Sequence, residues 1–449
     1  MSEPRPRRAA ARGRRSAEGG TLARHGRLRR SGPWRSILKL LAASIAVVVV
    51  SAVSIAAIAT WDVSTSFKKT VHLVDASGNP VPEVGAIDGA FNILLVGTDT
   101  RTGQGAGYGG LGDSSGAGLN DVTMLLHVSK NHEQATVVSF PRDMFVPIPS
   151  CPNPKGGFYS AMSRQKINTT LTYGGLSCTV LTVEHLTGMT IPYAAEITFD
   201  GVIRMSDAVG GVPVCVSGNI DDPNTNLHLA AGEHTLKGKE ALEFLRTRHG
   251  VGDGSDLGRI SNQQLFLSSM VRTVKSADTL ANPAKVYGLA KAAAKSMTLT
   301  DSLNISTLVS MAMALKNVDL GKVAFVQYPN AYVTGGVAPI TDAADALFTA
   351  LKKDQPITIT GGTGAEGVGS VVETPKPTDT AGESKKGSSS SSSSPSSSAT
   401  SGSSSSSSGS SDADKGKVAT PSTGDAVALP DTVHGQTANQ KTCSRAYDF

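Results

Sequence analysis

Short apolar runs alternate with longer amphipathic stretches between residues 85 and 360. Residues 91–96 form an apolar run that ends at Gly97, which indicates a strand buried on both faces. Two further runs predict strands joined by a polar hairpin turn at residues 130–133. The predicted strands are 91–96, 122–128, 135–140, 193–199, 212–216 and 323–327, and the predicted helices are 179–187, a short one between 199 and 212, 237–244, 256–274 and 283–297.

This order of elements predicts an α/β fold in which a central sheet carries helices on both sides. The stretch is long enough to bury one sizeable core. We therefore expect a single catalytic or binding domain over residues 91–360, preceded by a linker over residues 61–90.

The N-terminal 60 residues have a different character. Residues 1–36 hold eleven arginines and almost no large apolar side chains, so they cannot form a core. Residues 40–59 carry no charge and, as a helix, would span about 30 Å, which matches one bilayer crossing. Trp34 and Trp61 flank this run, where their rings would lie at the two headgroup layers. The sequence predicts a basic tail over 1–36 and a transmembrane helix over 37–60.

The arginines also predict the orientation of this signal anchor. Positive residues stay on the cytoplasmic side, so everything after Trp61 is expected outside the cell, on a single-pass membrane protein. A cleaved signal peptide is the alternative, but the basic region and the apolar run are both long for one, and Trp61 stands where small residues should allow cleavage. Nucleic-acid binding by the basic arm is a weaker explanation, and we expect no nucleic-acid partner.

Serine dominates the C-terminal part of the chain. Residues 388–411 are almost pure serine, a composition typical of flexible coil, and we expect residues 361–449 to be a disordered tail. Four cysteines lie beyond the anchor, where disulfides are permitted. Cys151, Cys178 and Cys215 are expected to form one bridge with one cysteine left free; the spacing does not say which two pair, and Cys443 has no evident role.

Charged residues follow the ends of three predicted strands. Asp99 and Arg101 come after the first strand, Asp121 opens the second, and Arg142 and Asp143 close the third. Strand ends are where binding groups usually collect, so these side chains are expected to meet. The aspartates Asp99 and Asp121 are candidate Mg²⁺ ligands, since Mg²⁺ takes one or two carboxylates plus phosphate oxygens and water. Capping or turn formation is their structural alternative.

A second charged group begins at Arg246. Arg246 and Arg248 are two residues apart and would point the same way in an extended segment. Asp256, Arg259 and Gln263 are three and four residues apart, so they lie on one side of the next predicted helix. This row of side chains begins at the N-terminus of the helix. Helix amides together with several arginines favour a phosphate or diphosphate. Any one of these arginines alone would more often be a surface charge, but the whole set crowds a glycine-rich turn.

These residues resemble the motifs of the LytR-CpsA-Psr (LCP) family of cell-wall glycopolymer transferases, actinobacterial type. The resemblance runs through NILLVGTDTR, NDVTMLLHV, VVSFPRDMFVPIP, KINTTLTYGG, ITFDGVIRMSDAVGGVPVCV and AGEHTLKGKEALEFLRTRHGVGDGSDLGR. It implies an α/β/α sandwich with a mixed central sheet that binds a polyprenyl-pyrophosphate-linked polymer, with the lipid in an apolar groove and Mg²⁺ (or Mn²⁺) at the pyrophosphate.

The resemblance also implies a role for each site residue. Asp99 and Asp121 would be the metal-associated carboxylates and, with Arg142, the catalytic residues. Asp256 would orient the arginines. The expected pyrophosphate contacts are Arg101, Arg142, Arg246, Arg248, Arg259 and Gln263.

The implied activity is transfer of a glycopolymer from its lipid carrier to peptidoglycan. Two alternatives remain at this point: a polyprenyl-pyrophosphate hydrolase, and a non-catalytic module that holds the glycolipid. GEHTLKGKE lacks the spacing and the Ser or Thr of a nucleotide-binding loop. The resemblance names neither the glycopolymer nor the residues of the lipid groove.

Overall fold

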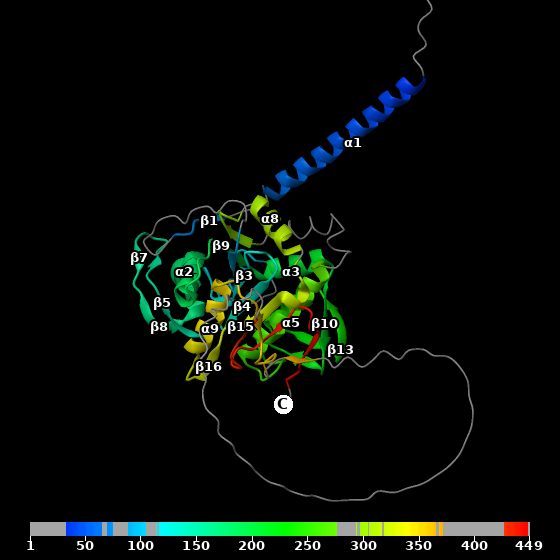
Figure 1. The fold of residues 1–449 in the computed structure, drawn as a ribbon. Coiled ribbons are helices and arrows are strands. Elements are labelled where there is room, and N and C mark those ends of the chain that lie inside the picture. Colours follow the sequence, from blue (N-terminus) through cyan, green and yellow to red (C-terminus); the bar gives the residue numbers. More distant parts are fainter. Residues whose placement is uncertain are drawn as a thin grey trace, which may run out of the picture. The chain divides into compact units, whose positions relative to one another are not determined.

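The computed structural model describes residues 33–64, 70–74, 89–104, 114, 116–275, 293, 297–303, 305–316, 318–364, 368–370 and 426–447 (Figure 1). Two units separate by their internal contacts, Met1–Ile58 and Ala59–Phe449. Helix α1 (Pro33–Ser64) covers the predicted anchor. Among the described helices, none meets the length and apolarity needed to cross a bilayer. The transmembrane helix over 37–60 stays a prediction.

An eight-stranded mixed sheet forms the centre of the second unit. Its middle strands β2, β3 and β4 are antiparallel neighbours, whereas β9 runs parallel to β2 and β15 runs parallel to β4. In spatial order the strands are β1 (Thr70–Val71), β14 (Met297–Thr300), β9 (Tyr193–Ile197), β2 (Phe91–Thr98), β3 (Asn120–Val128), β4 (Ala135–Phe140), β15 (Val323–Gln327) and β21 (Gly435–Thr437).

Helices cover both faces of this sheet, because successive side chains of a buried strand point to opposite sides. In β2, Leu94 and Val96 pack into the core that also contains α2 and α9, while Leu95 packs against the core that contains α5 and α8. The mixed α/β fold predicted from the sequence is confirmed. The helices are α2 (Thr170–Thr187), α3 (Phe199–Val209), α4 (Gly238–Arg246), α5 (Asp256–Lys275), α8 (Ile305–Lys316) and α9 (Thr341–Lys352), with 3₁₀ turns η1 (Ile167–Thr169) and η2 (Leu320–Lys322).

A smaller four-stranded sheet packs against α5 through its own core, in which Val214 and Phe244 meet Phe266. Its strands are β13 (Gly232–Leu236), β10 (Val212–Val216), β22 (Thr442–Ser444) and β19 (Val368–Ser370). Five two-stranded pairs complete the fold: β5 (Phe145–Ile148) with β8 (Met162–Lys166), β6 (Cys151–Pro152) with β7 (Phe158–Tyr159), β11 (Ile220–Asp222) with β12 (Leu227–Leu229), β16 (Asn330–Val333) with β17 (Gly336–Pro339), and β18 (Ile357–Thr358) with β20 (Val427–Ala428).

The C-terminal end corrects the prediction of a disordered tail over residues 361–449. Residues 426–447, which we call the C-terminal strap, add β21 to the edge of the central sheet and β22 to the smaller sheet (Figure 1). The domain therefore does not end at residue 360. The segment is short and its apolar residues are few, so only its tertiary pairing reveals the strands. The serine-rich residues 388–411 lie outside the described residues, as does almost all of the predicted helix 283–297.

All four cysteines are paired. Cys151 bonds Cys178, which confirms one bridge among the first three cysteines. Cys215 bonds Cys443, so the expectation that one of the three stays free is wrong. The reason is the parallel pairing of β10 with β22, which places these two residues directly opposite each other with 4.5 Å between their Cα atoms.

Candidate functional site

The sheet brings the three predicted strand ends to one edge. Thr98 at the end of β2 pairs with Asn120 at the start of β3, and Thr123 pairs with Phe140 at the end of β4. The antiparallel order of these strands therefore places Asp99, Asp121 and Arg142 in the same region, as the sequence predicted.

Asp99 ties together the two ends of the loop between β2 and β3. Its Oδ1 atom accepts hydrogen bonds from the Ser114 hydroxyl at 2.8 Å and from the Leu119 amide at 2.7 Å. Gly118 has a φ of +71°, and a Cβ there would lie 2.7 Å from the same oxygen, so only glycine fits this close approach. Both hydrogen bonds use Oδ1, which leaves Oδ2 able to face a ligand.

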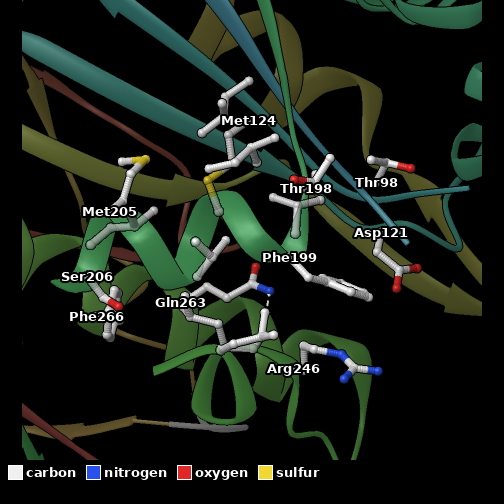
Figure 2. Close-up of a pocket in the computed structure, with 18 of the residues that line it drawn as sticks. Thr98, Asp121, Met124, Thr198, Phe199, Met205, Ser206, Arg246, Gln263 and Phe266 are labelled. Carbon is white, nitrogen blue, oxygen red and sulfur yellow. Dashed lines mark hydrogen bonds between the residues drawn. The ribbon is translucent and has the colours of Figure 1, made fainter. Parts of the chain in front are cut away.

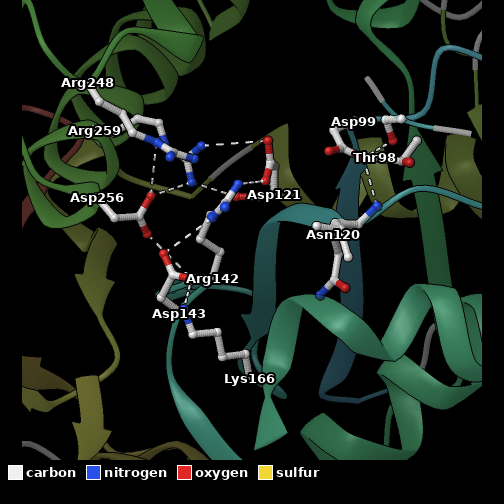
Figure 3. Close-up of polar contacts among 12 residues, drawn as sticks. Thr98, Asp99, Asn120, Asp121, Arg142, Asp143, Lys166, Arg248, Asp256 and Arg259 are labelled. Atoms are coloured by element: carbon white, nitrogen blue, oxygen red, sulfur yellow. Dashed lines mark hydrogen bonds and ion pairs between the residues drawn. The ribbon is translucent and has the colours of Figure 1, made fainter. Parts of the chain in front are cut away.

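Arg142 lies at the centre of an ion-pair chain (Figure 3). Its Nη1 atom contacts Asp121 Oδ1, and its Nε atom lies 3.4 Å from Asp143 Oδ2. Lys166 contacts the other oxygen of Asp143 at 2.9 Å. Burial opposes ionisation of Asp143, but the hydrogen bond from Lys166 and the charges of Arg142 and Lys166 outweigh it, so the pKa of Asp143 lies below its ordinary value. Asp143 is therefore a fixed anion at neutral pH.

Helix α5 joins this chain through its first turn. Arg259 is 3 % exposed, and its Nη2 atom lies 2.6 Å from Asp256 Oδ1 and donates to the Asp121 carbonyl oxygen at 2.8 Å. Arg248 Nε lies 3.6 Å from the same Asp256 oxygen, and the Arg142 amide donates to Asp256 Oδ2 at 3.3 Å (Figure 3). Asp256 thus contacts the guanidinium groups of Arg248 and Arg259 and the backbone of Arg142, and its orienting role stays a prediction.

Arg101 and Arg246 contact an aromatic ring instead of an aspartate. Both guanidinium groups stack on the ring of Phe199, 4.8 Å and 4.6 Å from its centroid. Arg101 Nε and Nη1 are buried and have no hydrogen-bond partner in the described part of the chain, and no ion pair is found there for Arg246. Burial, followed by the nearby charge of Arg101, lowers the pKa of Arg246. The charges of Asp121 and Asp99 act in the opposite direction but do not outweigh these effects. Two neighbouring cations that form no ion pair among the described residues favour an anionic ligand.

An apolar cavity of about 140 Å³ opens beside Arg246, and Phe199 is part of its lining (Figure 2). We call it the lipid cavity because its lining is mostly apolar. Arg246, Arg259, Asp121 and Gln263 supply its charged and amide groups, and Gln263 Nε2 donates to the Leu245 carbonyl oxygen at 2.9 Å. The apolar side chains come from β2, β3, β9, α3, α4 and α5: Leu95, Val122, Met124, Ile197, Val202, Met205, Leu242, Leu245, Phe266, Leu267 and Met270.

One prediction about these residues needs correction. The sequence predicts that Arg246 and Arg248 point the same way from an extended segment, but α4 continues to Arg246 and only Thr247 turns extended. The two side chains therefore diverge, Arg246 to Phe199 and Arg248 to Asp256. The stripe of Asp256, Arg259 and Gln263 on one helix is present in α5.

Sequence reasoning missed Phe199, Lys166 and the lining of the lipid cavity. The lining residues come from segments more than 170 positions apart, so no local pattern links them. The aromatic start of α3 in ITFDG was a usable signal, because an aromatic side chain beside predicted arginines is a common stacking partner.

Within the described residues, no group of three His, Cys, Asp or Glu side chains gathers as a metal site. Asp99 and Asp121 are carboxylates at the same edge of the sheet, and carboxylates hold Mg²⁺ together with phosphate oxygens and water. Among the described residues, the hydrogen bonds to Asp99 come from Ser114 and Leu119 and both reach Oδ1, while Asp121 already contacts Arg142. An ion there would need the negative charge of a bound phosphate as well.

The sequence is similar to several characterised proteins. It is 32% identical over 281 residues to the cell wall biosynthesis protein LcpA of Corynebacterium glutamicum, a match that covers 58% of this chain and 53% of LcpA. It is also 32% identical to the probable cell wall biosynthesis protein LcpB of the same organism, covering 63% of this chain and 65% of LcpB. The chain thus matches between half and two thirds of the length of these two relatives.

More distant similarity extends to other proteins. The polyisoprenyl-teichoic acid–peptidoglycan teichoic acid transferase TagT of Bacillus subtilis is 26% identical, over 63% of this chain and 84% of TagT. Among solved structures, a LytR-Csp2A-Psr enzyme from Actinomyces oris matches with a TM-score of 0.46 at 22% identity, over 63% of this chain and 95% of that one. The sequence model of the LytR_cpsA_psr family matches residues 57–353, which is most of the chain, and the protein therefore belongs to the LytR-CpsA-Psr family.

Proposed function

We propose that this protein transfers a glycopolymer from a polyprenyl-pyrophosphate carrier to peptidoglycan. One observation carries the proposal: Arg101 and Arg246 stack on the ring of Phe199 without an ion pair among the described residues, and Arg246 and Phe199 line an apolar cavity. A ligand that matches both features has a pyrophosphate next to a long apolar chain. The name of the relative TagT, a polyisoprenyl-teichoic acid–peptidoglycan transferase, supports the same class of donor.

Different residues of the site would bind the prenyl chain, the pyrophosphate and the transferring phosphate of this donor. The prenyl chain would lie among the apolar side chains of the lipid cavity, and the pyrophosphate would replace solvent around Arg101 and Arg246. Arg142, Arg248 and Arg259 are already held by Asp121 and Asp256, so they reach the transferring phosphate in a fixed position. Preorganised guanidinium groups of this kind stabilise charge that develops during phosphoryl transfer.

The reaction exchanges one phosphorus–oxygen bond for another. An acceptor sugar hydroxyl forms a bond to the phosphorus that bears the donor sugar, and the bond from that phosphorus to the bridging oxygen breaks. Polyprenyl phosphate leaves, and the hydroxyl proton passes to Asp99 or Asp121. Mg²⁺ held by these two carboxylates would supply further neutralisation of the phosphate charge.

The proposal also puts the site outside the cell on a single-pass anchor, with the N-terminus in the cytoplasm. The uncharged run over residues 40–59 and the preceding arginines support this orientation. The two disulfides support it independently, since such bonds persist in exported proteins and are rare in the cytosol.

A direct test uses the full-length protein in detergent with a synthetic polyprenyl-pyrophosphoryl saccharide, Mg²⁺ and peptidoglycan. We expect saccharide joined to peptidoglycan through a phosphodiester, detected by mass spectrometry after muramidase digestion. Release of saccharide phosphate with no joined product would show a hydrolase instead. Tight binding of the donor lipid with no turnover would show a glycolipid-binding module.

A further inference from the structure

A second cavity lies beyond the ion-pair chain. It encloses about 340 Å³ between the end of β4, the start of α5 and the β16–β17 hairpin, and we call it the hairpin cavity. Asp143 and Asp256 line it, whereas Asp121 lines the lipid cavity. Arg142 contacts both Asp121 and Asp143, so it connects one lining residue of each cavity (Figure 3).

The hairpin is attached to both halves of the charged cluster. The Val337 amide donates to the Asp143 carbonyl oxygen at 3.3 Å, and a Cβ at Gly336 would collide with that oxygen, so only glycine allows the approach. On the other side, the Tyr332 hydroxyl lies 3.5 Å from Asp253 Oδ2 and from Ser255 Oγ, just before α5. The hairpin therefore places Tyr332 near the start of α5, in the same cavity lining as Asp256.

The lining indicates the chemistry of the occupant. Tyr332 is 62% exposed, an unusual state for a large aromatic side chain held at its hydroxyl. The carboxylates of Asp143 and Asp256 accept hydrogen bonds from hydroxyl groups, and no Lys or Arg among the described residues lines the cavity to bind a phosphate. Arg142, Lys166 and Arg259 already neutralise them, so a cation gains little here. A neutral ligand with an apolar face and a rim of hydroxyls fits best, which describes a pyranose ring.

The geometry of phosphoryl transfer indicates whether this ring belongs to the acceptor or to the donor. The attacking and leaving oxygens of a phosphoryl transfer lie roughly in line. Polyprenyl phosphate leaves on the side of the lipid cavity, so the attacking hydroxyl must arrive from the other side of the arginines. The hairpin cavity opens there, next to Asp143 and Asp256.

We propose that the hairpin cavity binds a pyranose ring of the acceptor peptidoglycan, with Tyr332 stacking on the ring and so determining acceptor specificity. The proposal rests on the proposed transfer function. The donor's first sugar has the same chemistry and bonds to the same phosphorus, so the test must separate the two sources.

The test compares Tyr332→Ala, Tyr332→Phe and Tyr332→Trp in the full-length protein. Phe158→Ala is the matched control, because Phe158 is also exposed (48%) and lines neither cavity. KM for a soluble peptidoglycan fragment and for the donor lipid are measured separately, together with the ratio of transfer to hydrolysis. We expect Tyr332→Ala to raise the acceptor KM about tenfold, the loss of one well-packed aromatic contact, and to shift the ratio toward hydrolysis. Donor KM should stay within about twofold.

The conservative variants separate stacking from folding. Tyr332→Phe and Tyr332→Trp should keep the acceptor KM near that of the unchanged protein. An unchanged acceptor KM in Tyr332→Ala would overturn the proposal, and a rise in donor KM alone would assign the cavity to the donor sugar instead.

A binding measurement makes the proposal independent of turnover. Saturation-transfer NMR with an N-acetylhexosamine disaccharide from peptidoglycan should show contact with the unchanged protein and lose it in Tyr332→Ala. No contact with the unchanged protein would contradict the hairpin subsite even if transfer occurs. Contact without transfer would contradict the proposed function while leaving the subsite standing.

Discussion

Arg101 and Arg246 differ from the other arginines of the site in what neutralises them. Arg142, Arg248 and Arg259 each contact an aspartate, so their charges are largely balanced before a ligand arrives. Arg101 and Arg246 share the face of Phe199 and form no ion pair among the described residues, although the charges of Asp121 and Asp99 act on Arg246 from farther away. In the proposed function, these two cations bind the pyrophosphate.

Arg246→Ala should weaken donor binding more than an arginine substitution on the same face of the domain. Loss of hydrogen bonds to a charged ligand costs about 2 kcal/mol, or roughly 30-fold in Kd. Arg204→Ala is the control, because Arg204 lies on α3 near Phe199 but is 44% exposed and pairs with Asp200. Titration of a fluorescent polyprenyl-pyrophosphate analogue measures both; equal Kd values for the two variants would contradict the assigned role.

Asp256→Asn should lower turnover more than donor affinity. The substitution removes the charge that holds Arg248 and Arg259, so both guanidinium groups lose their fixed position, while Arg101 and Arg246 still bind the pyrophosphate. We expect kcat to fall roughly 100-fold, within the range for losing preorganised electrostatic groups. Steady-state kinetics test this, and a rise in donor KM with an unchanged kcat would speak against it.

The sequence predicted which charged residues meet but not which are already paired. Asp99, Asp121 and Arg142 follow strand ends, and the order of antiparallel strands is enough to bring them together. Whether an arginine meets an aspartate or an aromatic ring depends on helix ends. Arg246 reaches Phe199 because α4 continues through it, a boundary that the motif FLRTRHG does not mark.

At the scale of elements, the C-terminal strap supports the loop that carries Arg248. The Gly252 amide donates to the Arg445 carbonyl oxygen at 2.9 Å, and the Tyr447 amide donates to the Gly250 carbonyl oxygen at 3.1 Å. The Cys215–Cys443 bond fixes this strap to β10. The strap lies outside residues 57–353, so the family match says nothing about it.

Removing this bond should therefore affect the site as well as stability. The Cys215→Ser/Cys443→Ser variant is expected to lose roughly 2–5 kcal/mol of unfolding free energy. It should also lower kcat more than donor affinity, because the Arg248 loop loses its support. The Cys151→Ser/Cys178→Ser variant is the control, since that bond joins β6 to α2 away from the loop. Equal kcat values for the two variants, at temperatures where both are folded, would contradict this role of the strap.

The helices around the lipid cavity predict a dependence on prenyl chain length. Met205 of α3 lines this cavity, and Met205→Trp would fill part of it. We expect the variant to weaken binding of a long-chain donor about tenfold and to leave a donor with a single prenyl unit unaffected, since burial of each methylene contributes about 0.8 kcal/mol. Competition binding with the two lipids checks this. Equal loss for both lipids would instead indicate a general distortion of the site.

Elements with strong local patterns were predictable. The strands over residues 135–140, 212–216 and 323–327 match β4, β10 and β15, because each is an apolar run bounded by polar or glycine residues. The strands β21 and β22 were missed because GQT and TCS carry no strand signal and form only by pairing with β15 and β10. Helix α9 was missed as well, although its buried apolar residues recur every three or four positions, as on one face of a helix.

For the whole domain, stability should depend on pH through His127 in the central sheet. Burial lowers the pKa of His127 from its ordinary value of 6.5, although the charge of Asp354 acts in the opposite direction. The unfolded chain therefore takes up a proton first as the pH falls, and the stability that neutral His127 gives above pH 6.5 is lost below it. Between pH 7 and pH 5 the melting temperature should fall less in His127→Gln than in the unchanged protein. Parallel curves would exclude this contribution.

The fold, the ion-pair cluster and the lipid cavity together support one central claim, which is that the sugar-bearing phosphate moves to peptidoglycan while the other phosphate stays with the lipid. A donor labelled with ³²P only at the phosphorus that bears the sugar tests it most directly, with full-length protein, Mg²⁺ and peptidoglycan. We predict label in a phosphodiester that becomes soluble only after muramidase digestion, and no label in the polyprenyl phosphate. Label released as free sugar phosphate, or unlabelled saccharide joined to peptidoglycan, would contradict the account.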